Sequence, residues 1–361
     1  MRRADLVVVG AGVVGAATAW WASRLGLDVV VLERFEAGHH RGSSHGGVRV
    51  FRLAYPQPDY VRLARQALEL WRELEAEGDQ PLLELTGGID FGHGEGVAAS
   101  AAGLRKAGES FEFLEPAAAE ERFGGFAFTG PVLYQPQGGR VWAARSVAAL
   151  AAGADRNGAE LRYDEMVEAI TVHGDVADVR TAQEVYRAPH VVVAAGAWVQ
   201  DLLAGVVALP SLRVTREQPA HFAPRDPAHV WPSFIEHSPD VAFVLYGLSE
   251  PGVGVKLGEH MVGAPVHPDR RSFELDPAAL ATVRAQAERV LPGVYPEPVA
   301  ADTCLYTSTA NEDFVIDRVG PITVASACSG HGFKFGPATG RLVAEVALGQ
   351  RQTLARFALP H

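Results

Sequence analysis

The stretch LVVVGAGVVGAATAWWASRLGLDVVVLE, residues 6–33, decides the fold of this 361-residue chain. It opens with a β-branched run and closes with a second β-branched run that ends on Glu33. Between the two runs, Gly10, Gly12 and Gly15 have the spacing G-x-G-x-x-G. A strand, a glycine turn, a helix and a second strand in this order are typical of the start of a doubly wound sheet that binds a dinucleotide.

Each part of this pattern has a physical role in such a site. The first glycine permits a tight turn, the second leaves the backbone bare where the pyrophosphate lies, and the third lets the helix pack closely on the strand. The N-terminus of the helix then offers free N–H groups and a positive dipole end to the phosphates. Glu33 follows Gly10 by about twenty residues, where an acid accepts hydrogen bonds from a ribose. The same acid would repel the 2′-phosphate of NADP.

The residues between Asp5 and Arg24 carry no charge, which raises the alternative of a signal peptide or a membrane span. A span needs about 20 apolar residues in one helix. Three glycines interrupt this stretch and a second β-branched run follows it at once. We therefore expect a nucleotide-binding unit and no membrane partner.

Composition narrows the class of protein further. Hydrophobic residues make up 48% of the chain and charged residues 21%, which is typical of a globular protein, and the length suits two domains. The net charge of −11 argues against nucleic acid as a partner and favours a small ligand. Only two cysteines occur, Cys304 and Cys328, so we expect no disulfide framework and a reducing, cytoplasmic setting.

The glycine fingerprint alone does not distinguish an NAD-binding from an FAD-binding protein, so this distinction depends on the residues that follow. After Glu33 the chain shows a loop, residues 34–47, with the polar cluster RGSSHGG, where a plain dehydrogenase would begin another helix. Arg49 and Arg52 follow, three residues apart as in one helical turn, within an apolar stretch. The planar fork of arginine suits a carboxylate. An NAD-dependent dehydrogenase remains an alternative at this point.

With these features the chain resembles the FAD-dependent amine oxidases of the D-amino-acid oxidase superfamily, and within it the branch of monomeric sarcosine oxidase and N-methyltryptophan oxidase. The resemblance spans nearly the whole chain, and its motifs occur in the family's order. They are the fingerprint, the Gly-Ser-Ser-His loop, the two arginines, VVVAAGAW (191–198), GVKLGEH (254–260), CLYT (304–307), DFVID (313–317) and SGHGFKF (329–335).

The resemblance implies an α/β fold with a Rossmann-like FAD-binding domain and a mixed-sheet substrate domain, as in p-hydroxybenzoate hydroxylase. The expected FAD-binding domain is discontinuous, from residues 1–80, 140–212 and 301–361, and the substrate-binding domain takes residues 81–139 and 213–300. Sequence periodicity predicts helices at residues 60–78, 143–158, 276–291 and 338–348, a β-meander at 161–190, and short strands and turns at 81–137.

The family further implies which residues bind FAD. They are Gly10, Gly12, Gly15, Glu33, Arg34, Ser43, Ser44, Arg49, Val167, Gly196, Cys304, Gly330, His331, Gly332 and Lys334. Cys304 matches the cysteine that bonds covalently to the flavin, although a buried structural cysteine is the alternative. Cys328 matches no functional position, and we expect it in the core.

Six residues match the family's catalytic positions: Lys256, His260, Arg52, Lys334, Tyr246 and Tyr306. The resemblance implies that Arg52 and Lys334 hold the substrate carboxylate, while Lys256 promotes the reaction with oxygen because a positive charge stabilises superoxide as it forms. His260 would influence the protonation of the substrate amine. The two tyrosines would line the amine pocket.

The implied activity is oxidation of a secondary amino acid, such as sarcosine or another N-alkyl glycine, by a monomer that uses O2 and gives an imine and H2O2. Three departures leave the N-substituent open: Gly47-Val48 replaces an Asp-Thr pair, Glu259 replaces a pocket tyrosine, and residues 232–244 align poorly. A glycine oxidase acting on glycine or on a bulky N-carboxymethyl amine of a biosynthetic pathway is one alternative. A dehydrogenase of the same fold with another electron acceptor and a non-catalytic flavin-binding protein are the others.

Overall fold

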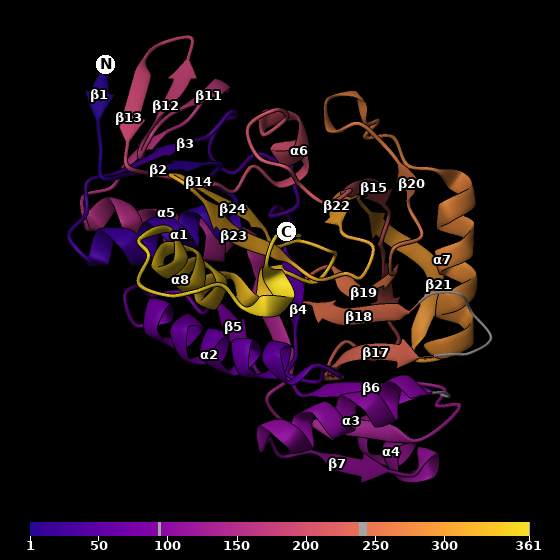
Figure 1. Ribbon diagram of the computed structural model, residues 1–361. Helices are drawn as coiled ribbons and strands as arrows, with labels where there is room; N and C mark the ends of the chain where they lie inside the picture. The colour runs from indigo at the N-terminus through magenta and orange to yellow at the C-terminus, as the bar shows by residue number, and fades with distance from the viewer. Residues whose placement is uncertain (93–94, 238–243, 361) are drawn as a thin grey trace.

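The computed structural model describes residues 1–92, 95–237 and 244–360. Within these ranges the largest sheets have six and eight strands and lie on opposite sides of the molecule (Figure 1). The mixed α/β architecture that the sequence predicts is confirmed.

The six-stranded sheet contains the N-terminal fingerprint. Its order is β10 (Glu160–Arg162), β3 (Val29–Leu32), β2 (Leu6–Val9), β14 (His190–Val193), β24 (Ile322–Ser326) and β23 (Val315–Val319). All neighbours pair in parallel except β23, which runs antiparallel to β24. The carboxyl ends of the parallel strands therefore meet at one edge of the sheet, where α/β proteins bind ligands.

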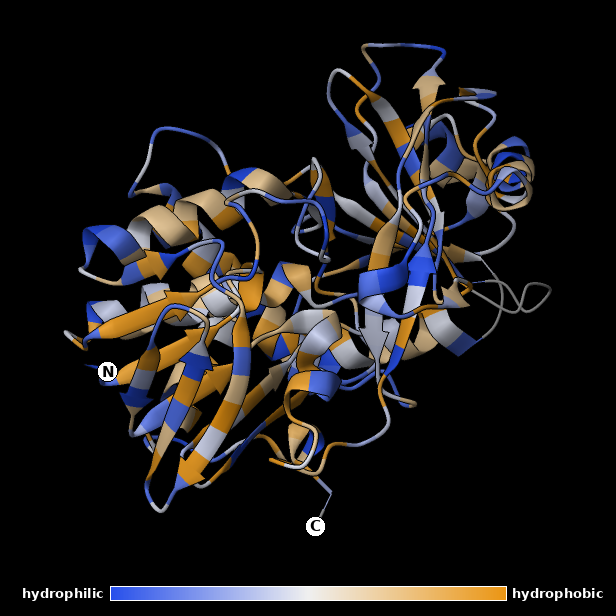
Figure 2. Ribbon diagram, turned by 90° about the horizontal axis from the view of Figure 1, so that it is seen from above, coloured by the Kyte–Doolittle hydropathy of each residue, from blue (hydrophilic) through white to orange (hydrophobic). Residues whose placement is uncertain are grey.

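Both faces of this sheet are covered (Figure 1). Helices α1 (Val13–Arg24), α5 (Ala143–Arg156) and α8 (Gly336–Ala347) lie on one face, and the meander β11 (Val167–His173), β12 (Val176–Thr181) and β13 (Val185–Ala188) on the other. Side chains alternate along a strand, so Leu6 and Val8 pack toward the helices while Val7 and Val9 pack toward the meander. A strand buried on both faces must be apolar throughout, as Figure 2 shows near the N-terminus.

The eight-stranded sheet joins two distant parts of the chain. Its order is β21 (Val294–Ala301), β16 (Ala220–Pro224), β19 (Gly254–Glu259), β18 (Leu245–Glu250), β17 (Ser233–His237), β6 (Gly88–Gly92), β8 (Val132–Gln135) and β7 (Glu112–Leu114). The parallel pair β6 and β17 makes the junction. We propose from this arrangement that the expected division into two discontinuous domains holds.

Smaller elements complete the described chain. One three-stranded sheet has the order β20 (Ala264–Pro265), β15 (Arg213–Glu217), β22 (Cys304–Ser308), and another β4 (Val48–Phe51), β9 (Gly139–Trp142), β5 (Leu83–Glu84), while β1 (Arg2–Arg3) pairs with β13. The other helices are α2 (Pro58–Glu75), α3 (Glu95–Ala107), α4 (Pro116–Phe123), α6 (Val199–Leu202) and α7 (Pro277–Val290). Short 3-10 turns are η1 (Gly196–Trp198), η2 (Pro268–Arg270), η3 (Phe333–Phe335) and η4 (Ala355–Phe357).

The four predicted helices correspond to α2, α5, α7 and α8 within a few residues. The predicted meander corresponds to β11–β13 over residues 167–188 only, because residues 161–162 lie in β10 and residue 190 in β14 of the six-stranded sheet. Two predictions are wrong. Residues 81–137 contain the helices α3 and α4 besides short strands, because the alanine-rich sequence of α3 carries too few large apolar residues to show a helical period. Arg49 lies in strand β4, so its three-residue spacing from Arg52 is not a helical turn. Among the described residues, no helix is both long and apolar enough to span a membrane.

Candidate active site

A cavity of about 970 Å³ runs from the carboxyl edge of the six-stranded sheet to the eight-stranded sheet. It brings together residues from all parts of the chain. Of the residues predicted for the site, it is lined by Gly10, Gly12, Glu33, Arg34, Ser43, Ser44, Arg49, Arg52, Val167, Gly196, Tyr246, Lys256, His260, Cys304, Tyr306, Gly330, His331, Gly332 and Lys334. Gly15 does not line it. A Cβ atom at Gly15 would lie 1.8 Å from the carbonyl oxygen of Gly10, which agrees with the packing role expected of the third glycine.

The fingerprint turn leaves little room for side chains. Gly10 has φ +99°, and a Cβ there would lie 2.5 Å from the carbonyl oxygen of Ala194. A Cβ at Gly12 would lie 3.1 Å from Oγ of Ser44. The turn therefore presents bare backbone to the cavity at the N-terminus of α1, as binding of a pyrophosphate requires.

Replacing Gly10 with alanine should therefore destabilise the protein far more than replacing Gly26. Both glycines have positive φ, +99° and +79°, but a Cβ at Gly26 would meet no atom within 4 Å in the described part of the chain. Gly26→Ala should cost about 1–2 kcal/mol from backbone strain, and Gly10→Ala should add about 1–3 kcal/mol from overpacking and weaken FAD binding. Urea unfolding and FAD titration of the apoprotein measure both effects. Equal losses in the two variants would contradict this account.

Glu33 stands at the end of β3, buried against the fingerprint. Its carboxylate accepts hydrogen bonds from the amides of Ala11 (2.8 Å) and Phe35 (3.0 Å). Burial alone would raise the pKa of Glu33, but His39 and these amides outweigh it and lower that pKa. Glu33 is therefore an ionised acceptor beside the N-terminus of α1, as expected for a ribose-binding acid.

The loop at residues 41–47 is held by hydrogen bonds on three sides. Arg49 donates to the carbonyl oxygens of Ser43 (3.2 Å) and His45 (2.6 Å). Ser43 Oγ donates to the carbonyl oxygen of Leu305 at 2.6 Å, which ties the loop to β22. Ser44 Oγ accepts from the amide at the start of α1 at 3.0 Å. Arg49 thus shapes the loop, and its charge lies at the cavity wall.

Arg52 and Lys334 meet on one aromatic ring. The guanidinium of Arg52 lies 4.4 Å from the ring centroid of Tyr55, and Lys334 Nζ donates to the Tyr55 hydroxyl at 2.9 Å and to the carbonyl oxygen of His331 at 2.5 Å. Burial, then repulsion by Arg52, holds the pKa of Lys334 well below its usual range. The guanidinium of Arg52 and the amino group of Lys334 therefore converge at one end of the cavity, an arrangement suited to a carboxylate. Tyr55, which joins them, was not singled out from the sequence.

His331 has a fixed role within this cluster. Its Nδ1 lies 3.2 Å from the Tyr55 hydroxyl and its Nε2 lies 3.1 Å from the carbonyl oxygen of Glu312. Burial, then the charge of Lys334, lowers the pKa of His331 well below its usual range. The neutral ring with its proton on Nε2 satisfies both contacts, because the carbonyl can only accept and Tyr55 can then donate to Nδ1. We expect His331 to position Tyr55 and Lys334.

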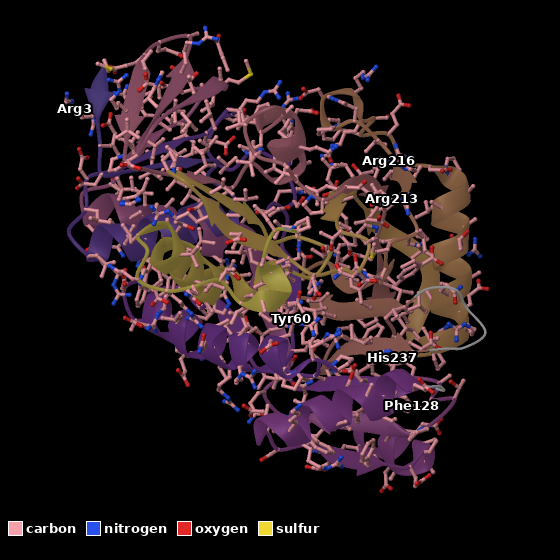
Figure 3. All side chains as sticks on the ribbon, in the orientation of Figure 1. Arg3, Tyr60, Phe128, Arg213, Arg216 and His237 are labelled. Carbon is pink, nitrogen blue, oxygen red and sulfur yellow. The ribbon has the colours of Figure 1, made fainter. Side chains whose placement is uncertain are left out.

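Asp90, a buried acid that contacts Arg52, was not predicted from the sequence either. Asp90 of β6, 1% exposed, lies 3.1 Å from Nη1 of Arg52 and 2.9 Å from Nε2 of His237 at the end of β17. Figure 3 labels His237, which lines the cavity, and Tyr60, which lines it from α2. Asp90 partly neutralises Arg52, so the guanidinium reaches the cavity already oriented. No local pattern marks Asp90, because β6 and β17 meet only in the folded chain.

His260, Tyr246 and Tyr306 line the substrate end of the cavity. His260 Nε2 lies 3.2 Å from a carboxylate oxygen of Glu312, and the hydrogen bond from His260 lowers the pKa of Glu312. Burial raises the pKa of Tyr246 to about 12 and that of Tyr306 well above its usual range, so both phenols stay neutral. Glu312 was not predicted, although it directly precedes the DFVID motif.

Lys256 enters the cavity from the middle of the eight-stranded sheet, on β19. Side chains alternate along this strand, so Lys256 shares its cavity-facing side with His260, whereas Glu259 is buried on the other side. Burial, then repulsion by Arg49, lowers the pKa of Lys256 to about 8. Residue 259 therefore faces away from the cavity wall that Lys256 lines.

Both cysteines line the cavity. Neither forms a disulfide, and each is partly exposed. The expectation that Cys328 belongs to the core is therefore wrong: it follows β24 and reaches the cavity from the edge of the six-stranded sheet, whereas Cys304 begins β22. His45 also lines the cavity, and its Nε2 is buried without a hydrogen-bond partner among the residues described.

The volume of the cavity and the groups that line it fit FAD. A volume of about 970 Å³ is at the upper end for ligand sites, which are about 300–1,000 Å³. The glycine turn at Gly10 offers space and N–H groups for phosphates, and Glu33 offers an acceptor for ribose. The buried Nε2 of His45 has no hydrogen-bond partner within residues 1–92, 95–237 and 244–360. The structure thus defines a dinucleotide-binding protein with its site between two sheets.

Comparison with known proteins gives the family. The profile described as FAD dependent oxidoreductase matches residues 5–346. Monomeric sarcosine oxidase of Streptomyces avermitilis is 33% identical over 370 residues, covering 95% of this chain and 93% of that protein. N-methyl-L-tryptophan oxidase of Yersinia pestis is 30% identical over 354 residues, covering 94% of each.

Solved structures agree with this result. NikD, described as an unusual amino acid oxidase essential for nikkomycin biosynthesis, matches with a TM-score of 0.87 and 30% identity, covering 99% of this chain and 98% of its own. The chain belongs to the FAD dependent oxidoreductase family, which confirms the resemblance seen in the sequence and identifies FAD as the cofactor.

Proposed function

We propose that the protein is an FAD-dependent oxidase of secondary amino acids, such as sarcosine or another N-alkyl glycine, with O2 as electron acceptor. The observation that carries this proposal is the pair Arg52 and Lys334, which converge on Tyr55 at one end of the cavity while Lys256 lines another wall. The names of the relatives, sarcosine oxidase and N-methyl-L-tryptophan oxidase, support the same substrate class.

When bound, FAD accepts the electrons that leave the carbon next to the substrate nitrogen and passes them to oxygen. The residues of this chain bind and orient the substrate. Arg52 and Lys334 hold its carboxylate, and Tyr246 and Tyr306 enclose the amine as neutral phenols. His260, with Glu312 at 3.2 Å, accepts a proton from the substrate ammonium before oxidation.

Lysine usage supports this assignment. The chain has 32 lysines and arginines, of which only Lys106, Lys256 and Lys334 are lysines. Lys106 is exposed on α3, whereas the other two line the cavity. A sequence that places arginine almost everywhere else keeps its lysines where a compact ammonium with an adjustable pKa is useful. We infer that both serve the reaction.

We further propose that FAD is attached to Cys304, which lines the cavity at the start of β22. Acid precipitation should leave the flavin on the protein, and Cys304→Ser should release all of it into the supernatant. Cys328→Ser is the matched control, because this second cavity cysteine should keep the flavin attached. Release of all flavin from the wild-type protein would refute the link, while the rest of the proposal would stand.

The substrate is tested by measuring H2O2 with glycine, sarcosine, proline, pipecolate and bulkier N-alkyl glycines. We expect the highest kcat/KM among the N-alkyl glycines. A preference for glycine would favour the glycine oxidase alternative. Substrate-dependent bleaching of the flavin without peroxide would favour a dehydrogenase. The two unpaired cysteines lead us to propose a cytoplasmic location.

A further inference from the structure

The space beside Gly47 is filled by a carboxylate from another segment. A Cβ atom at Gly47 would lie 1.8 Å from Oε1 of Glu250 and 2.4 Å from its Cδ. Gly46 has φ +91°, whereas Gly47 is not among the residues with positive φ. Backbone conformation therefore does not require glycine at residue 47. The absent side chain makes room for Glu250, which ends strand β18 of the eight-stranded sheet.

Glu250 is held next to Lys256 by the sheet. Its Oε2 lies 3.0 Å from Nε2 of His221, and both side chains are largely buried, at 14% and 10% exposure. His221 on β16 pairs directly with Lys256, as does Leu248 on β18, two residues before Glu250. Residues that pair directly, and residues two apart on a strand, share a face of a sheet. Lys256, His221 and Glu250 therefore share one face.

Charged groups of both signs surround Lys256 among the residues described. The titratable and charged groups that face it are Arg49, His45, His221, Glu250, Asp302 and Cys304. The two acids differ in exposure, because the side chain of Asp302 is 62% exposed and that of Glu250 only 14%. Water screens the exposed charge more strongly. Beside Cys304, Glu250 is thus the less exposed of the two carboxylates that oppose the effects of burial and Arg49 on Lys256.

The ionisation of Glu250 is secured by its own contacts. The hydrogen bond from His221 lowers the pKa of Glu250, and Lys256 and Arg49 lower it further. Nδ1 of His221 is buried without a hydrogen-bond partner in the described part of the chain. His221 therefore has Glu250 as its partner and acts to orient that carboxylate.

We propose that Glu250 is a positioning residue whose carboxylate, placed in the space that Gly47 leaves free, keeps Lys256 in its ammonium form at the cavity wall. This proposal deepens the proposed function and rests on it only for the role of the Lys256 ammonium in the reaction with oxygen. The direct consequence is a property of Lys256 itself, namely the pH at which it loses its proton.

The test is a titration of Lys256 by NMR. Protein labelled with 13C at the lysine Cε gives signals from three lysines, and the signal lost in Lys256→Met is that of Lys256. In the FAD-loaded enzyme we expect Glu250→Gln to lower the titration midpoint of Lys256 by about one pH unit. Lys106 is exposed and serves as an internal reference whose midpoint should not move.

A second variant tests the geometry. Glu250→Ala combined with Gly47→Asp returns a carboxylate to the same space from the other side, and we expect it to restore most of the shift that Glu250→Ala causes alone. Glu84→Gln is the matched control, since Glu84 is a half-buried acid paired with Arg140 outside the cavity. Its variant should leave the midpoint unchanged.

An unchanged midpoint in Glu250→Gln would overturn the proposal, as would an equal shift in Glu84→Gln. A double variant that titrates like Glu250→Ala would overturn the assignment of the carboxylate to the space beside Gly47. These outcomes are separate from the proposed function, which fails instead if Lys256→Met reacts with oxygen as fast as the wild type.

Discussion

Replacing Lys256 with methionine is expected to slow the reaction of the reduced enzyme with oxygen by about a thousandfold. A unit charge about 4 Å from the developing negative charge contributes about 4 kcal/mol at an effective dielectric constant near 20, and each 1.36 kcal/mol is tenfold in rate. Lys256 lines the cavity and is the ammonium at this wall. Methionine keeps the length of the side chain and removes the charge.

Stopped-flow spectroscopy separates the two halves of the reaction. Anaerobic reduction by substrate should change little in Lys256→Met, while reoxidation on mixing with oxygen should slow. Lys106→Met is the matched control, since that lysine is exposed on α3. Reoxidation at the wild-type rate in Lys256→Met would favour a dehydrogenase that uses another acceptor.

Because Lys256 can lose its proton, the rate of reoxidation should depend on pH. Burial and then Arg49 lower the pKa of Lys256 to about 8. Below this pH the side chain is an ammonium and reoxidation should be fast, and above it the charge is lost and the rate should fall. A plot of reoxidation rate against pH should therefore decrease through about pH 8, and Lys256→Met should remove this step. A rate that rises over the same interval would contradict the role of the ammonium.

Replacing Arg52 with methionine is expected to lower kcat/KM for an amino acid substrate by about a hundredfold or more. The loss follows from removing charge-assisted hydrogen bonds to the substrate carboxylate, worth about 3 kcal/mol. It also leaves Asp90 buried with His237 as its remaining partner. Without Arg52, the carboxylate of Asp90 should weaken the binding of an anion at the same place.

Substrates without a carboxylate provide the decisive comparison. A secondary amine that lacks this group should react slowly with the wild type and about as slowly with Arg52→Met. Arg140→Met is the matched control, because Arg140, like Arg52, is a largely buried arginine paired with an acid, Glu84, but lies outside the cavity lining. Its kcat/KM should stay near that of the wild type. An equal loss with both kinds of substrate would show that Arg52 supports the fold and does not recognise the carboxylate.

Local sequence determined the fingerprint and its surroundings. A β-branched run, three glycines and Glu33 define a strand, a turn and an acid within a short stretch of chain, so their geometry depends on neighbours in the sequence. The same holds for helix α2, whose apolar residues recur with a helical period. The alanine-rich helix α3 was missed because small residues mark no face strongly.

The motif order also indicated which residues share one site. Lys256, Cys304 and Lys334 were assigned from resemblance, and the cavity contains all three. Their partners were not found in this way. Tyr55 lies close to the arginine pair and Glu312 directly precedes DFVID. Their positions beside these motifs were the only sequence feature that could have marked them as site residues.

Tertiary structure alone decided the pairings between distant strands. Asp90 meets Arg52 and His237 because β6 and β17 pair in parallel, and Glu250 fills the space at Gly47 because β18 ends beside the loop that Arg49 holds. The local sequence around a charged residue in a strand does not indicate which residue will pair with it. Which charges neutralise one another depends on register and burial, so the sequence by itself predicted the cofactor and the proposed anchors, and the fold decided which charged groups lie beside them.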